Sequence, residues 1–139
     1  MRARALGLAL LLAGCPRQTP LPVVDPAVAH VGAWYGSGPG FPAERLCLIF
    51  CPNGLLFAGE TACDALEAPD FRLPYAASRV GEQVEARQMA APTRPPFSFR
   101  FAVQADGSAL ADIGEQKNLP FDRVASLSPL CLGTGPAGG

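Results

Sequence analysis

Apolar and polar residues alternate over short stretches of this chain, which is the period of a β-strand and not of a helix. The clearest stretch runs from Phe97 to Val103, where every second side chain is apolar and would lie on one face of an extended strand. The dipeptide Asn53-Gly54 separates two apolar runs, which is the strongest short signal for a β-hairpin. These patterns give eight candidate strands: residues 31–36, 45–51, 55–59, 71–75, 83–87, 97–104, 108–113 and 121–125.

The candidate strand at 71–75 contains Pro74, which cannot donate a ladder hydrogen bond, so this segment is expected at a sheet edge. A helical period is hard to find, and residues 61–67 are expected to form one short turn at most. Seven or eight short strands with turn signals between them predict an all-β domain, either a small antiparallel β-barrel or a β-sandwich. In so small a domain, the aromatic residues around Phe99 are expected to fill a core rather than line a pocket.

The first fourteen residues have the organisation of an export signal. Arg2 and Arg4 form a short basic start, and nine apolar or small residues follow, which span about 14 Å as a helix, roughly half of a hydrocarbon core. Residues 12–15 read Leu-Ala-Gly-Cys, which resembles the lipobox of bacterial lipoproteins in all four positions. The resemblance implies a diacylglyceryl group on Cys15, cleavage after Gly14 and then N-acylation by a fatty acid such as palmitate.

These lipid chains would anchor the mature protein to a membrane, because two or three acyl chains hold a protein stably where one does not. Pro16 follows the anchor, whereas an Asp at that position is the usual inner-membrane retention signal in enterobacteria. The expected location is therefore the cell envelope. In a cell with two membranes we expect the outer membrane, on its periplasmic or surface face.

Composition divides the mature chain into three parts. Residues 15–30 carry the lipidated Cys and four prolines, which predicts a tether stiffened by polyproline II structure. Residues 31–132 hold the candidate strands, and residues 133–139 form a Gly-rich tail that is expected to be disordered. Arg2 and Arg4 are lost with the leader, so nine of the 11 basic residues remain against 12 acidic ones, a balance of −3. No basic run survives, which argues against nucleic acid as a partner.

Four cysteines remain once Cys15 carries lipid, and an even number in a small exported domain predicts two disulfides. They are Cys47, Cys51, Cys63 and Cys131, which allow three connectivities. We favour Cys51–Cys63 with Cys47–Cys131. A zinc site is the rival, but Cys-x-x-x-Cys is not the spacing of a zinc knuckle, and the one histidine, His30, lies in the predicted tether. We therefore expect no bound metal and no cofactor.

Gly32-Ala33-Trp34 opens the first candidate strand and resembles the Gly-x-Trp motif that begins lipocalins and related small barrels. In that family the Trp lies at the closed end of the barrel, and an Arg from the last strands packs over its ring. The resemblance implies the same arrangement for Trp34 and Arg123, as a stacked pair that contributes about 0.5–2 kcal/mol. The alternative is a single core Trp in an unrelated β-sandwich.

Motifs of catalysis are missing from the sequence, which has no Gly-x-Ser-x-Gly elbow, phosphate-binding loop or metal-ligand cluster. A histidine in a tether would not be held in place as a general base. The acidic run lacks the spacing of an EF-hand and is interpreted as a solvated loop; it consists of Glu60, Asp64, Glu67 and Asp70. We therefore expect not an enzyme but a non-catalytic binding module for a small apolar ligand. The alternative is a structural or assembly lipoprotein that contacts another envelope protein.

Overall fold

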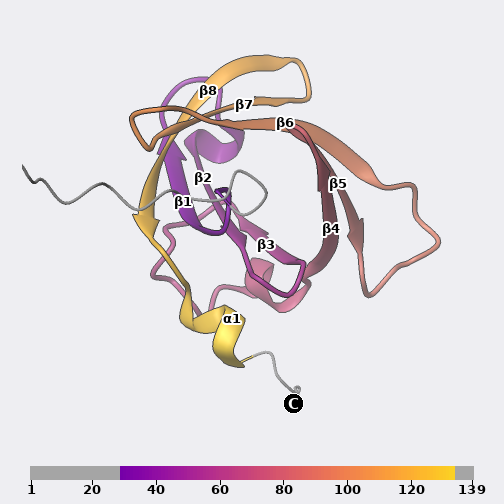
Figure 1. The fold of residues 1–139 in the computed structure, drawn as a ribbon. Helices are drawn as coiled ribbons and strands as arrows, with labels where there is room; N and C mark the ends of the chain where they lie inside the picture. Colours follow the sequence, from indigo (N-terminus) through magenta and orange to yellow (C-terminus); the bar gives the residue numbers. More distant parts are fainter. Residues whose placement is uncertain (1–28, 134–139) are drawn as a thin grey trace, which may run out of the picture.

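Eight antiparallel strands close into a barrel in the computed structural model of the protein, which describes residues 29–133. The strands are β1 (Gly32–Ser37), β2 (Arg45–Phe50), β3 (Leu55–Gly59), β4 (Tyr75–Val80), β5 (Gln83–Gln88), β6 (Phe97–Val103), β7 (Ala109–Ile113) and β8 (Gln116–Ala125). They pair in sequence order, and β8 returns to pair with β1 (Figure 1). The all-β prediction is confirmed, and of its two architectures the barrel is the one observed.

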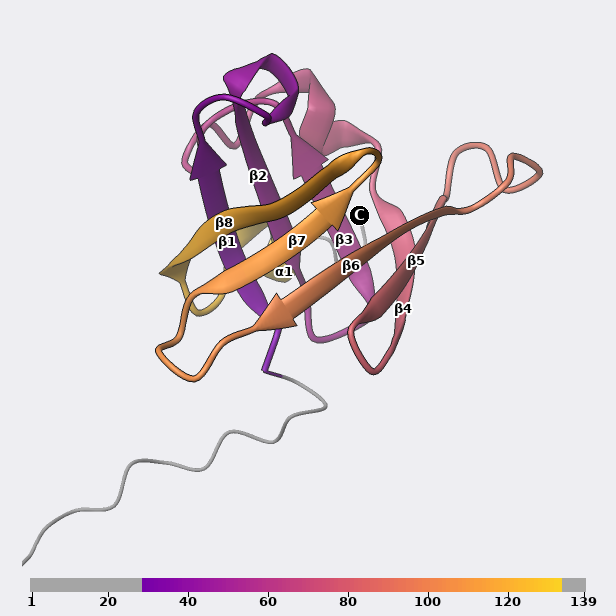
Figure 2. The same cartoon turned by 90° about the horizontal axis from the view of Figure 1, so that it is seen from above.

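Short helical segments accompany the strands. They are the 3-10 segments η3 (Pro42–Glu44) and η4 (Pro69–Arg72) and the helix α1 (Pro129–Gly133). Figure 2 shows η3 and η4 at the barrel end opposite to the start of β1. None of the helices within residues 29–133 is long and apolar enough to cross a bilayer. The leader, Cys15, most of the predicted tether and residues 134–139 lie outside the described residues.

The β2–β3 hairpin forms where the Asn-Gly signal predicts it. Gly54 adopts a φ of 91°, which favours glycine, and Asn53 Oδ1 accepts a 3.1 Å hydrogen bond from the Leu55 backbone N–H. The Cys51 backbone N–H donates to Leu55 O at 2.8 Å and closes a three-residue loop. The turn sets the register of the hairpin, in which Cys47 lies opposite Gly59.

Strand β2 buries both of its faces, and this divides the apolar residues into two clusters. One face carries Leu46, Leu48 and Phe50 into the barrel. The barrel cluster is completed by Trp34, Phe41, Leu56, Val84, Ala86, Phe99, Phe101, Ala109, Ala111, Leu119 and Phe121. The other face of β2 carries Cys47, Ile49 and Cys51 into the outer cluster, which contains Ala33, Phe57 and Phe71 and packs against Leu130 and Cys131 of α1. A second core therefore lies outside the barrel wall.

The predicted edge strand at 71–75 is wrong. Residues 69–72 form η4, whose Phe71 is buried in the outer cluster, and β4 begins only at Tyr75. Burial in β4 alternates between half-buried and exposed residues, so its pattern is that of a strand. However, its half-buried face includes Ala77 and Arg79, and its exposed face ends in Val80. The half-buried arginine and the exposed valine reverse the usual order of apolar and polar positions. A hydrophobicity pattern therefore does not indicate this strand.

Candidate functional site

The barrel interior is filled by aromatic side chains. The Phe101 ring lies 5.1 Å from that of Trp34, 5.0 Å from that of Phe50 and 5.8 Å from that of Phe121, measured between centroids. Phe97, at the start of β6, remains 47% exposed. A hollow at the barrel end beside Phe50 measures about 30 Å³, far below the roughly 300–1,000 Å³ of small-molecule sites. The expectation that the aromatic strand fills a core is met. The opposite mouth of the barrel keeps a hollow of about 370 Å³, whose lining includes Leu46, Ala58 and Tyr75.

The structure brings Trp34 and Arg123 together at one end of the barrel. They are cross-strand neighbours in β1 and β8, and the guanidinium carbon of Arg123 lies 4.5 Å from the centre of the fully buried Trp34 ring. A Cβ placed on Gly32 would lie 2.6 Å from Arg123 Nη1, so the glycine of the Gly-x-Trp motif leaves room for the arginine. The contact therefore lies where β1 begins and β8 ends.

The same two side chains hold the incoming chain on that end. Trp34 Nε1 donates a 2.8 Å hydrogen bond to the carbonyl of His30. The guanidinium of Arg123 donates to the carbonyls of Ala29 and Val31. These three hydrogen bonds, which we call the entry clamp, fix the backbone of residues 29–31.

His30 therefore does not belong to a free tether, and this corrects the sequence interpretation. Its ring packs edge-on against Phe50 with 5.0 Å between centroids. Burial is the largest influence on its pKa, and the positive charges of Arg79 and Arg123 add to it; together they lower the pKa to about 4. Its Nδ1 is buried and finds no hydrogen-bond partner within residues 29–133. The imidazole is therefore held in place against Phe50 and is neutral at pH 7.

Two disulfides are present, but their partners differ from those we favoured. Cys47 is bonded to Cys63, and Cys51 to Cys131. The register of the hairpin explains the exchange, because Gly59 lies opposite Cys47 and the chain leaving β3 stays at that end of β2. Cys51 lies about 13 Å further along the strand, so the segment around Cys63 meets Cys47 and not Cys51. All four sulfurs are used, which removes them as metal ligands.

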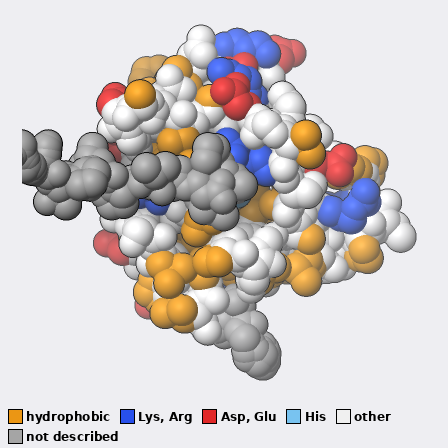
Figure 3. Space-filling view, viewed as in Figure 1, with side chains coloured by type: hydrophobic (Ala, Val, Ile, Leu, Met, Phe, Trp, Pro, Cys, Tyr) orange, Lys and Arg blue, Asp and Glu red, His pale blue; other side chains and the backbone are white. Residues whose placement is uncertain are grey.

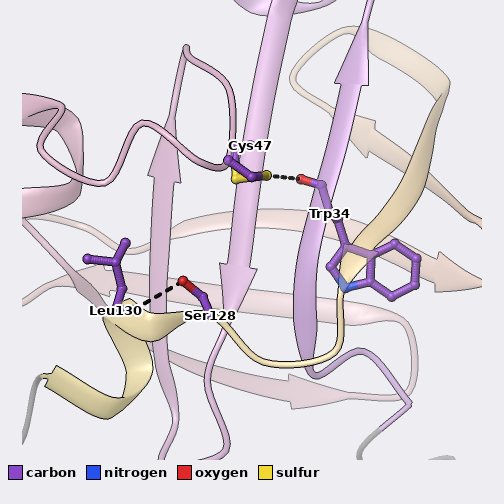
Figure 4. The surroundings of a disulfide bond; sticks show 5 residues. Trp34, Cys47, Ser128 and Leu130 are labelled. Carbon is purple, nitrogen blue, oxygen red and sulfur yellow. Dashed lines mark hydrogen bonds between the residues drawn. A yellow bond between two sulfur atoms is a disulfide. The ribbon is translucent and has the colours of Figure 1, made fainter.

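Figure 4 shows the surroundings of the Cys47–Cys63 bridge. Cys63 Sγ lies 3.4 Å from the carbonyl oxygen of Trp34, a contact rather than a hydrogen bond because a disulfide sulfur has no proton to donate. Below it, the buried Ser128 Oγ accepts a 3.1 Å hydrogen bond from the Leu130 backbone N–H at the start of α1. The first bridge thus pins the segment after β3 to β2, and the second pins α1.

A groove of about 490 Å³ lies on the outside of the barrel between these two pinned segments. We call it the outer groove. Its walls come from β1, β8, the segment after β3 and the start of α1. They consist of Ala33, Tyr35, Ala62, Cys63, Asp64, Leu66, Val124, Ala125, Ser128 and Pro129. The register shift between Ala33 and Trp34 lets Ala33 and Ala125 share the outer face while Trp34 turns inward. Two of the three alanines in the lining therefore come from this irregular pairing.

Exposed apolar side chains continue from the outer groove onto the surface. Val124 is 53%, Leu127 40% and Leu132 70% exposed. The space-filling view shows apolar side chains gathered over the region of α1 (Figure 3). This surface extends the apolar lining beyond the groove itself.

The acidic run divides between two places. Asp70 Oδ2 accepts a 2.9 Å hydrogen bond from the Glu60 backbone N–H and closes the segment after β3, whereas Asp64 lines the outer groove. Within residues 29–133, no three His, Cys, Asp or Glu side chains gather as metal ligands would. Asp70 therefore stabilises the loop after β3, and Asp64 contributes a negative charge to the outer groove.

Comparisons with protein-family models, with curated proteins and with solved structures found no match. The Gly-x-Trp likeness therefore assigns the chain to no family. The fold defines the class as a closed eight-stranded antiparallel β-barrel with a buried aromatic cluster. Two disulfides in so small a domain suggest a location outside the cytoplasm.

Proposed function

We propose that this protein is a lipid-anchored envelope lipoprotein whose barrel is a non-catalytic binding module for a small apolar ligand, held in the outer groove. The observation that carries the proposal is the groove of about 490 Å³ on the outside of the barrel, whose walls are mostly apolar. The hollow of about 370 Å³ at the barrel mouth has Glu60, Asp70 and Gln88 among its lining residues and is the less apolar of the two. The larger volume lies within the roughly 300–1,000 Å³ of small-molecule sites. The barrel then acts as a rigid scaffold and not as a container.

The anchor rests on the Leu-Ala-Gly-Cys sequence at residues 12–15, behind a basic and apolar leader. The disulfides support export, because thiols stay reduced in the cytoplasm of most cells. The packing of His30 against Phe50 supports a non-catalytic role, since this imidazole is occupied by its aromatic neighbour.

Binding is tested with the uncharged fluorescent probe N-phenyl-1-naphthylamine. Ala62→Trp places an indole in the outer groove and should weaken probe binding by more than tenfold, because the groove volume is lost. Ala90→Trp, at an exposed site between β5 and β6, is the matched control and should bind like the wild type. Equal binding by all three proteins would refute the groove. A native mass spectrum of protein extracted from its own membrane should show the acyl chains, both disulfides and a retained ligand.

A second function, contact with another envelope protein, is favoured by the exposed apolar residues beside the groove. Leu127→Ser with Leu132→Ser removes that surface without touching the groove lining. If assembly is the function, this double variant loses a cross-linked envelope partner and keeps its affinity for the probe. If ligand binding is the function, Ala62→Trp is the variant that loses activity.

A further inference from the structure

We propose that the outer groove selects amphiphiles with a positively charged head, such as long-chain amines, over anionic ones such as fatty acids. This inference rests on the proposed binding function and names the chemical class of its ligand. It follows from the sign of the charges around the groove and from the size of the residues that line it.

The charges at the groove are negative. Asp64 is exposed and is the one charged residue among those that line it. Tyr35, also in the lining, lies opposite Asp122 of β8, which is exposed. Tyr35 packs against the outer cluster while Phe121, the neighbour of Asp122, points into the barrel, so Asp122 lies on the outer face beside Tyr35. Two carboxylates thus flank the apolar lining.

The positive charge closest along the chain is turned away from the groove. Arg123 separates Asp122 from Val124, but its guanidinium covers Trp34 and donates to the carbonyls of the entry clamp. No Lys or Arg is among the residues that line the groove. An anionic head would therefore face two carboxylates and no Lys or Arg of the lining, whereas an ammonium head would face complementary charge.

The lining favours a narrow apolar body. Ala33, Ala62 and Ala125 contribute one methyl group each, and Leu66, Val124 and Pro129 supply apolar surface around them. A single unbranched chain suits a groove with such a lining, with its head at the level of Asp64. The hydrophobic effect then supplies affinity, and the carboxylates supply the choice between heads.

The test uses three ligands with the same decyl tail, each below its micelle concentration: decyltrimethylammonium, decyl maltoside and decanoate. Each competes with N-phenyl-1-naphthylamine for the full-length protein. We expect the cation to bind about fivefold more tightly than the neutral ligand, which is the effect of exposed ion pairs, and the anion to bind more weakly than both. The preference should shrink as salt is raised.

Asp64→Asn with Asp122→Asn should abolish the preference, so that the cationic, neutral and anionic ligands bind with similar affinities. Glu85→Gln, which removes an exposed carboxylate from β5, is the matched control and should keep the preference. Equal binding of the three ligands to the wild type, or a preference that survives in the double variant, would overturn the charge selection and leave the groove intact. If no ligand displaces the probe, or the probe itself does not bind, the binding function fails as well.

Discussion

The two disulfides close loops of very different length, and this predicts unequal contributions to stability. Cys51 and Cys131 are 80 residues apart, Cys47 and Cys63 only 16. In the chain-entropy model, removing the longer loop costs about 4.5 kcal/mol and removing the shorter about 3 kcal/mol. Each pair is changed to alanine separately. Each change removes two sulfurs that pack in the same outer cluster, so the local packing losses are of similar size.

The assay is urea denaturation of protein exported behind an ordinary secretory leader with Cys15→Ser, followed by fluorescence of the one tryptophan. Trp34 is fully buried, so unfolding shifts its emission to the red. Total stabilities of small domains are about 5–15 kcal/mol, so both losses should be measurable and the Cys51–Cys131 variant should be the weaker protein. A larger loss for the Cys47–Cys63 variant would refute the loop-length reasoning. Mass mapping of the unreduced protein after cleavage at Phe50, Phe57 and Phe71 checks the pairing independently, because these cuts put the four cysteines on four different peptides.

Three further outcomes are expected. Trp34→Ala should cost about 3–5 kcal/mol and Arg123→Met less, with a double variant that loses less than the sum because the side chains touch; additive losses in urea denaturation would contradict the contact. The pKa of His30 is about 4 in the folded protein against an ordinary 6.5, so the unfolded chain binds a proton that the folded one refuses. Stability should therefore fall as pH drops from 6.5 towards 4, and His30→Gln should reduce that fall; parallel curves for both proteins would speak against it. Cys15→Ser behind the native leader should accumulate as an unprocessed precursor without labelled fatty acid, and incorporation of label would disprove lipidation at that residue.

Local patterns predicted most of the strands because each signal lies within a few neighbouring residues. The alternation from Phe97 to Val103 became β6, and Asn53-Gly54 became the β2–β3 turn. β4 was placed wrongly because the burial of its residues depends on neighbours from distant parts of the chain. Half of β8 was missed for a related reason, since its first residues, from Gln116 onwards, are polar and exposed.

The candidate site depends on how β3 aligns with β2 and how β8 aligns with β1. These alignments cannot be derived from local sequence patterns. Whether Cys63 meets Cys47 or Cys51 is decided by where β3 ends against β2, a shift of a few residues. The outer groove depends on the irregular pairing of β1 with β8 and on both disulfides at once. The prolines before His30 place it in the predicted tether, whereas in the structure Trp34 donates to its carbonyl from 4 positions away. Arg123 donates to the carbonyls of its two neighbours, Ala29 and Val31, from 94 and 92 positions away. The Gly-x-Trp motif could have suggested this, since its glycine makes room for the arginine.

The entry clamp has a mechanical consequence for the lipid-anchored protein that we propose. β1 and β8 are the first and last strands, and their pairing closes the barrel. Tension arriving along the chain from residue 28 meets the three hydrogen bonds at residues 29–31 before it reaches the first ladder pair of β1. The opposite end of the chain is fastened covalently by Cys51–Cys131. Both fastenings lie where β1 begins and β8 ends, which is the end of the seam that would otherwise separate first under load. In the proposed lipoprotein, drag on the domain is therefore carried first by side chains and only then by the sheet.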